Sequence, residues 1–175
     1  KPTHYIILSG DQLYHMDLDE FLKKHEESGA EITIASTAVT RQDASGFGIL
    51  KTDPAGRITE FMEKPGPTKD INDWIIPDEA RTPAAQNGRD YLASMGIYIF
   101  NAQAMEDSLA NSLTDFGKEV IPEAIKRFNV RAYVYDGYWE DIGTIRNFYD
   151  ATLDLTSITP KFNFYDEDAP IYTHN

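Results

Sequence analysis

The chain has 175 residues, 41% hydrophobic and 12% aromatic, which is enough for one sizeable core. Its 29 acidic and 16 basic side chains give a net charge of −13, and such a surface repels nucleic acid and anionic membranes. The absence of cysteine excludes disulfides and thiolate metal sites, and no apolar run approaches the roughly 18 residues of a membrane span. We therefore expect a cytoplasmic protein with no nucleic-acid or membrane partner, in which a local cluster or a metal holds any anionic ligand.

Strand-like and helix-like segments alternate along the first half of the chain. Apolar spacing from Leu18 to His25 predicts an amphipathic helix that Asp17 caps and Gly29 ends. The turn signal Asp53–Gly56 predicts a β-hairpin between its flanking apolar runs. The expected strands of this half are Tyr5–Leu8, Glu31–Thr37, Phe47–Thr52 and Arg57–Met62.

The second half continues the alternation after an excursion. Four prolines and weak periodicity predict loop and short helix over Pro65–Arg89. Asn101 is a plausible cap for the helix that follows the next strand, and Pro122 belongs to the first turn or to a kink of a later helix. The expected elements are strands at Tyr91–Phe100 and Val130–Tyr135, and helices over 102–113, 120–128 and 144–153.

The order of these elements predicts the fold class. Strands alternating with helices imply an α/β fold with a mixed, mostly parallel sheet flanked by helices, and the hairpin adds the antiparallel strands. Asp11, Lys64 and Asp141 all follow strand-like runs. Since α/β sheets bind ligands beyond their strand ends, we expect these side chains to converge there.

Two carboxylates and a lysine at strand ends suggest metal-assisted chemistry on a phosphate. Asp11 and Asp141 could share a hard divalent cation, and Lys64 could hold an anionic oxygen group. Each signal also has a plain structural explanation. Asp11 alone is more often a turn former or helix cap, Glu63 and Lys64 could be solvated charges, and Trp139 could serve core packing as readily as a sugar platform.

Several stretches, in order along essentially the whole chain, resemble the sugar-phosphate half of the catalytic domain of glucose-1-phosphate adenylyltransferase, also called ADP-glucose pyrophosphorylase. The matching stretches are Leu8–Tyr14, Gly46–Gly48, Phe61–Pro65, Leu92–Tyr98, Asp115–Pro122, Tyr138–Thr144, Tyr165–Asp166 and Pro170–Thr173. The resemblance implies a partial Rossmann-like nucleotidyltransferase domain over residues 1–155. It also implies a tail, 156–175, that leads toward a left-handed β-helix domain.

That family makes ADP-glucose and pyrophosphate from ATP and glucose 1-phosphate with Mg²⁺, in glycogen or starch synthesis. By position, the resemblance assigns the metal to Asp11 and Asp141 and the phosphate of glucose 1-phosphate to Lys64. We expect these three residues to be catalytic. The expected substrate-binding residues are Gly48, Glu63, Lys64, Ser94, Tyr98, Asp115 and Trp139.

The glycine-rich loop that cradles the triphosphate in that family has no counterpart here. We therefore expect an internal piece of a longer protein that does not turn over by itself. Its parent is expected to be a homo- or hetero-tetramer in the cytoplasm, or in a plastid where the source is a photosynthetic eukaryote. Two alternatives stay open. One is a sibling nucleotidyltransferase with another base or sugar, and the other is a regulatory subunit that performs no chemistry.

Overall fold

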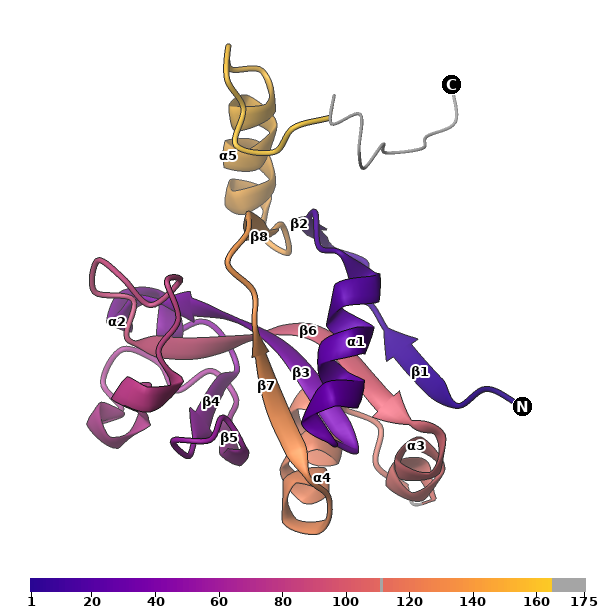
Figure 1. Ribbon diagram of the computed structural model, residues 1–175. Helices are drawn as coiled ribbons and strands as arrows, with labels where there is room; N and C mark the ends of the chain where they lie inside the picture. Colours follow the sequence, from indigo (N-terminus) through magenta and orange to yellow (C-terminus); the bar gives the residue numbers. More distant parts are fainter. Residues whose placement is uncertain (111, 165–175) are drawn as a thin grey trace. The chain divides into compact units, whose positions relative to one another are not determined.

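A computed structural model describes residues 1–110 and 112–164 (Figure 1). Its internal contacts divide the chain into two units. The first unit contains residues 1–9 and 17–136, and the second contains 10–16 and everything from 137 onward. The expected boundary at residue 155 stays a prediction, and most of the expected tail, residues 165–175, lies outside the described residues.

The first unit is built on a six-stranded sheet. Its central strand, β6 (Tyr91–Asn101), pairs with β3 (Ile32–Val39) from Tyr91 to Phe100, with one irregularity in the register. β4 (Ile49–Thr52) and β1 (His4–Ile7) also pair with β6, through Leu92–Ala93 and Tyr98–Asn101 respectively. The outer strands are β5 (Ile58–Met62), which pairs with β4, and β7 (Val130–Val134), which pairs with β3.

The mixed α/β class is confirmed, but the expectation of mostly parallel pairing is wrong for the described strands. Only β3 and β7 form a parallel pair, while every other pairing in this sheet is antiparallel. The reason is the place of β6. β1, β3, β4 and β7 all run in one direction, as the alternation of strands and helices predicts, but β6 runs the opposite way and is inserted among them.

Helices cover both faces of this sheet (Figure 1). On one face Phe21 of α1 (Leu18–Ser28) packs on Tyr133, with ring centroids 4.9 Å apart. On the other face Ile121 and Ile125 of α4 (Ile121–Arg127) join the main core. The remaining helices are α2 (Arg41–Ala44), α3 (Ala102–Leu109) and a π-helical turn at Phe116–Val120 that leads into α4.

The helix ends explain which predicted caps formed. Asp17 accepts hydrogen bonds from the backbone N–H groups of Asp19 and Glu20, and Gly29 ends α1 in the left-handed conformation, both as predicted. Asn101 precedes α3 but makes no side-chain cap bond. Its side-chain oxygen is taken by the imidazole of His25 at 2.8 Å, so the predicted cap is wrong because a buried partner competes for the acceptor.

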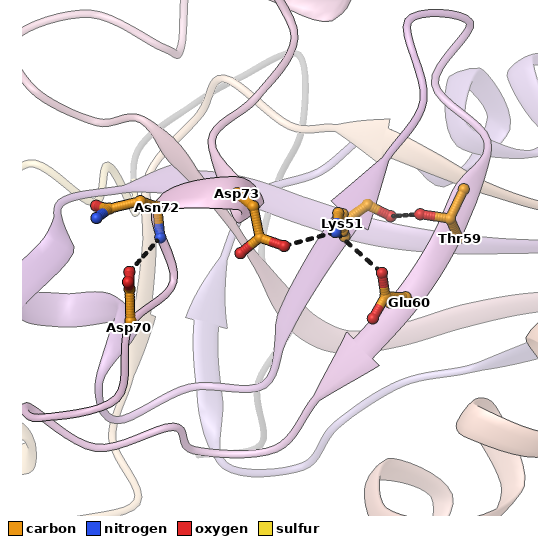
Figure 2. Close-up of polar contacts among 6 residues, drawn as sticks. All are labelled: Lys51, Thr59, Glu60, Asp70, Asn72 and Asp73. Carbon is orange, nitrogen blue, oxygen red and sulfur yellow. Dashed lines mark hydrogen bonds and ion pairs between the residues drawn. The ribbon is translucent and has the colours of Figure 1, made fainter.

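An ion pair joins the β4–β5 hairpin to the segment 65–89 that follows it. Asp53 accepts from the N–H groups of Ala55 and Arg57 and so closes the predicted turn. The excursion contains two short 3₁₀ turns, Asn72–Trp74 and Asp78–Ala80, as its composition predicts. Figure 2 shows Lys51 of β4 held between Glu60 of β5 at 3.0 Å and Asp73 of the excursion at 2.8 Å.

The second unit is a small sheet with one helix. β2 (Gln12–Tyr14) pairs antiparallel with β8 (Trp139–Asp141), and neither short strand was predicted. α5 (Ile145–Leu155) begins after Thr144, whose hydroxyl accepts from the N–H of Asn147. No helix in the described part of the chain is both long and apolar enough to cross a membrane.

Candidate functional site

The two predicted metal carboxylates lie together in the second unit. Asp141 is the last residue of β8, and Asp11 directly precedes β2, the strand that pairs with it. The N–H of Ile142 donates to the backbone carbonyl of Asp11 at 3.1 Å, which extends the pairing to both acids. This two-stranded ladder, and not the ends of parallel strands, brings the two residues together.

Gly143 provides the space into which both carboxylates turn. A Cβ at this position would lie 3.0 Å from Asp141 Oδ1 and 3.5 Å from Asp11 Oδ2, so these two oxygens are within about 6.5 Å of each other. The N–H of Gly143 also donates to Asp141 Oδ1 at 2.9 Å, which fixes the direction of that side chain. A side chain at 143 would fill the space between the two acids.

This pair suits a hard divalent cation, which prefers carboxylate oxygens. No group of three or more His, Cys, Asp or Glu side chains within residues 1–110 and 112–164 is arranged to hold a metal. Mg²⁺ commonly takes one or two carboxylates and fills its shell with water and substrate phosphates, so two carboxylates are a donor set that this ion can use. Burial raises the pKa of the adjacent Glu140, and the nearby Asp141, Asp150 and Asp154 raise it further against the opposing effect of Lys161.

The predicted substrate-binding residues other than Trp139 lie in the first unit, around the carboxylate of Glu63. Its Oε2 lies 2.9 Å from the position of a Cβ on Gly48 and 3.1 Å from that of a Cβ on Gly117. Asp115 Oδ1 lies 3.6 Å from the same point on Gly117. Two carboxylates thus face two glycines, whose missing side chains let Glu63 approach the backbone closely. Carboxylates in such a place can accept hydrogen bonds from sugar hydroxyls.

Lys64 stands beside this cluster in a conformation unusual for its residue type. Its φ is +44°, in the left-handed region that costs residues with a Cβ. Its backbone N–H donates to the carbonyl of Phe47 at 3.1 Å, and Nζ lies 3.9 Å from Glu63 Oε1. The side chain is 67% exposed, so its ammonium is available to an incoming anion.

Ser94 and Tyr98 lie on either side of an irregularity in β6. Opposite the step from Ala35 to Ser36 in β3, the pairing skips Met95 and Gly96, and Gly96 adopts a φ of +69°. The N–H of Gly96 donates to Ser94 Oγ, and the N–H of Ser94 donates to the carbonyl of Gly48 at 2.8 Å. This bulge places Ser94 next to Gly48, which the Glu63 carboxylate faces.

Two predicted substrate-binding aromatic residues, Tyr98 and Trp139, make contacts within the fold itself. Tyr98 is only 6% exposed and stacks on Phe116 with centroids 5.8 Å apart. Burial raises its pKa, with smaller contributions from Glu63 and Asp115, while a hydrogen bond with Ser94 lowers it. Trp139 belongs to the second unit, where its indole N–H donates to Gln12 Oε1 at 3.0 Å.

The structure therefore brings the predicted residues together in two groups, one in each unit. Asp11 and Asp141 form the first group, with Trp139 in the same small sheet. Lys64, Ser94, Tyr98 and Asp115 surround Gly48 and Glu63 in the other. Sequence reasoning missed Gly117 and Gly143. Both are glycines within one or two residues of a predicted acid, and that spacing signals a close approach to the carboxylate.

The whole pattern agrees with a comparison to known protein families. Residues 1–158 match the family described as nucleotidyl transferase, which covers nearly all of the described chain. The reaction type of that family is nucleotidyl transfer, a reaction for which a carboxylate pair suited to a divalent cation is appropriate. The chain belongs to the nucleotidyl transferase family.

Proposed function

We propose that the protein carrying this chain transfers the adenylyl group of ATP to glucose 1-phosphate and releases pyrophosphate. A phosphate oxygen of the sugar phosphate attacks the α-phosphorus, the bond from that phosphorus to the bridging oxygen breaks, and pyrophosphate leaves with the electron pair. The product is ADP-glucose. The observation that carries this proposal is Glu63 facing Gly48 and Gly117 with Lys64 beside it, an acceptor for sugar hydroxyls next to a cation for phosphate.

Each residue has a distinct part in the proposed reaction. Asp11 and Asp141 would hold Mg²⁺, which when bound offsets charge on the phosphate oxygens. Lys64 would hold the phosphate of glucose 1-phosphate through charge-assisted hydrogen bonds, because its ammonium is a mobile point charge with three donors. Glu63 would orient the sugar ring. No covalent intermediate is needed, since the two substrates need only be positioned for direct transfer.

The direct test is Lys64→Ala in the complete protein that carries this chain. Loss of one charge-assisted contact should raise the KM for glucose 1-phosphate about ten- to hundredfold and leave the KM for ATP nearly unchanged. Asp11→Asn should instead lower kcat, with modest effects on either KM. Lys69→Ala, in the same exposed segment, is the matched control and should change neither constant. A KM for glucose 1-phosphate within twofold of that of the parent would mean that Lys64 is a solvated lysine with no part in phosphate binding.

The same assay separates the two alternatives. Turnover of glucose 1-phosphate with another nucleoside triphosphate in preference to ATP, or of another sugar 1-phosphate with ATP, would identify the sibling enzyme. A purified protein with no turnover on any of these substrates would be the regulatory subunit. Intact Asp11, Lys64 and Asp141 favour catalysis, because a subunit without chemistry does not need them.

A further inference from the structure

Asn147 connects helix α5 to the loop that carries Asp141. Asn147 is the third residue of α5, after the cap Thr144, where a polar side chain usually reaches back to the N–H of the cap residue. Here the side-chain amide reaches further and donates from Nδ2 to the backbone carbonyl of Asp141 at 2.9 Å. The helix is thereby joined to the last residue of β8.

The peptide group between Asp141 and Ile142 is held from both sides. Its carbonyl accepts from Asn147, and its N–H donates to the backbone carbonyl of Asp11 at 3.1 Å. Because a peptide group is planar and rigid, these two bonds together fix its orientation. That peptide group therefore joins the backbone of Asp141 both to the backbone of Asp11 and to α5, at the end of the β2–β8 ladder.

The sheet next to this peptide group is small. β2 and β8 have three residues each and form a two-stranded sheet, an arrangement that is marginally stable by itself. The bond from Gly143 N–H to Asp141 Oδ1 fixes the side chain, but it does so relative to the same loop. The bond from Asn147 Nδ2 ties Asp141 itself to the eleven-residue helix, whereas the cap from Thr144 holds the residue directly before that helix.

We propose that Asn147 is a positioning residue for the carboxylate pair Asp11 and Asp141, an inference that rests on the proposed function because it takes this pair as the Mg²⁺ site. Asn147 does not touch the metal or a substrate. Its amide holds the 141–142 peptide group so that both carboxylates stay turned toward Gly143. Groups that orient metal ligands in this way commonly change metal affinity about ten- to hundredfold when removed.

The test measures Mn²⁺ binding to the chain by electron paramagnetic resonance, with Mg²⁺ as competitor. Asn147→Leu keeps the approximate size of the side chain and removes the donor. It should weaken Mn²⁺ binding about tenfold and speed hydrogen exchange of the Ile142 N–H, which loses its fixed orientation. Asn147→Gln keeps the donor and should recover part of the affinity.

Thr144→Ala is the matched control, because it removes the cap of α5 and leaves the Asn147 amide in place. It should lower helix stability without the tenfold loss of affinity. If Asn147→Leu binds Mn²⁺ within twofold of the parent while Asp11→Asn does not bind it, the positioning role is wrong and the metal assignment stands. If Thr144→Ala weakens binding as much as Asn147→Leu, the effect is that of helix stability and the positioning role is also wrong. If the parent chain binds no Mn²⁺, the metal assignment of the proposed function fails first.

Discussion

Glu63 extends its carboxylate over the backbone of Gly48, so that Oε2 lies 2.9 Å from the place that a Cβ on that glycine would take. The ring of Phe61 lies closer still, with Cζ 2.5 Å from the same point. Real Cβ atoms do not tolerate such contacts, so any side chain at position 48 must displace Phe61, Glu63 or both. The glycine is therefore a requirement of the proposed sugar site.

Gly48→Ala tests this requirement. The added methyl group should displace Glu63, raise the KM for the sugar phosphate and destabilise the fold by about 1–3 kcal/mol through overpacking. Steady-state kinetics of the complete protein and urea unfolding of the chain measure the two effects. Gly46→Ala is the control, since its Cβ would meet only the carbonyl of Asp43 at 3.7 Å, an ordinary contact. An equal KM for the sugar phosphate in the two variants would mean that Glu63 does not belong to the sugar site.

Gly143→Ala makes the corresponding prediction for the carboxylate pair. Its methyl group would meet Asp141 Oδ1 at 3.0 Å and Asp11 Oδ2 at 3.5 Å, and would occupy the space that both acids face. We expect Mn²⁺ affinity to fall about tenfold or more, because the two ligands are pushed apart. Gly10→Ala, in the same unit and with nothing within 4 Å of its Cβ, should bind Mn²⁺ as the parent does. Unchanged binding by Gly143→Ala would place the cation elsewhere.

The left-handed backbone of Lys64 predicts that two variants with the same loss of function differ in stability. Lys64→Gly and Lys64→Ala both remove the ammonium, so both should lose affinity for glucose 1-phosphate equally. Glycine tolerates a φ of +44° without the cost that a Cβ imposes, so Lys64→Gly should be more stable than Lys64→Ala by about 1 kcal/mol. At Lys69, whose φ is not positive, glycine should be the less stable of the two. The same order at both positions would mean that Lys64 carries no backbone strain.

Local signals in the sequence were sufficient for most of the first unit. Asp17 and Gly29 end α1 as predicted because a cap and a left-handed glycine act within a few residues. The turn at Asp53 likewise depends on contacts between near neighbours. The direction of β6 could not be predicted in this way, because it depends on the strands with which β6 pairs. Two of these strands, β1 and β3, lie 50 or more residues earlier in the sequence.

The candidate site shows the same division between local and distant causes. The motifs around Asp11, Lys64 and Asp141 singled out these residues as candidates. The short strands β2 and β8, which bring Asp11 and Asp141 together, have too few residues for a period to be visible. In α5 the apolar period predicted the helix correctly, but not its surroundings. Four apolar side chains of this helix are at least half exposed: Ile145, Phe148, Tyr149 and Leu153. The apolar face that the period predicts is therefore not a buried face here.

His25 gives the chain a predictable dependence of stability on pH. The residue is buried on α1, with Nδ1 2.7 Å from Thr33 Oγ1 and Nε2 2.8 Å from Asn101 Oδ1. Because Asn101 Nδ2 donates to the carbonyl of Ala30, its Oδ1 is the acceptor, and we assign the imidazole proton to Nε2. Burial lowers the pKa of His25, and His4, whose ring stands edge-on at 5.3 Å, lowers it further, while Asn101 and Glu26 act in the opposite direction.

A lowered pKa means that the unfolded chain binds a proton more readily than the folded one near neutrality. The contribution of His25 to stability is therefore complete above its ordinary pKa of about 6.5 and is lost as the pH falls below that value toward the pKa of the folded state. Urea unfolding between pH 7.5 and 5 should show a free energy that decreases with acidification by up to about 1.4 kcal/mol per pH unit. His25→Gln cannot titrate and should lose this part of the slope, while His15→Gln should keep it. If the parent and His25→Gln changed in parallel across this range, the slope would come from other groups, and His25 would have the same pKa in the folded and unfolded states.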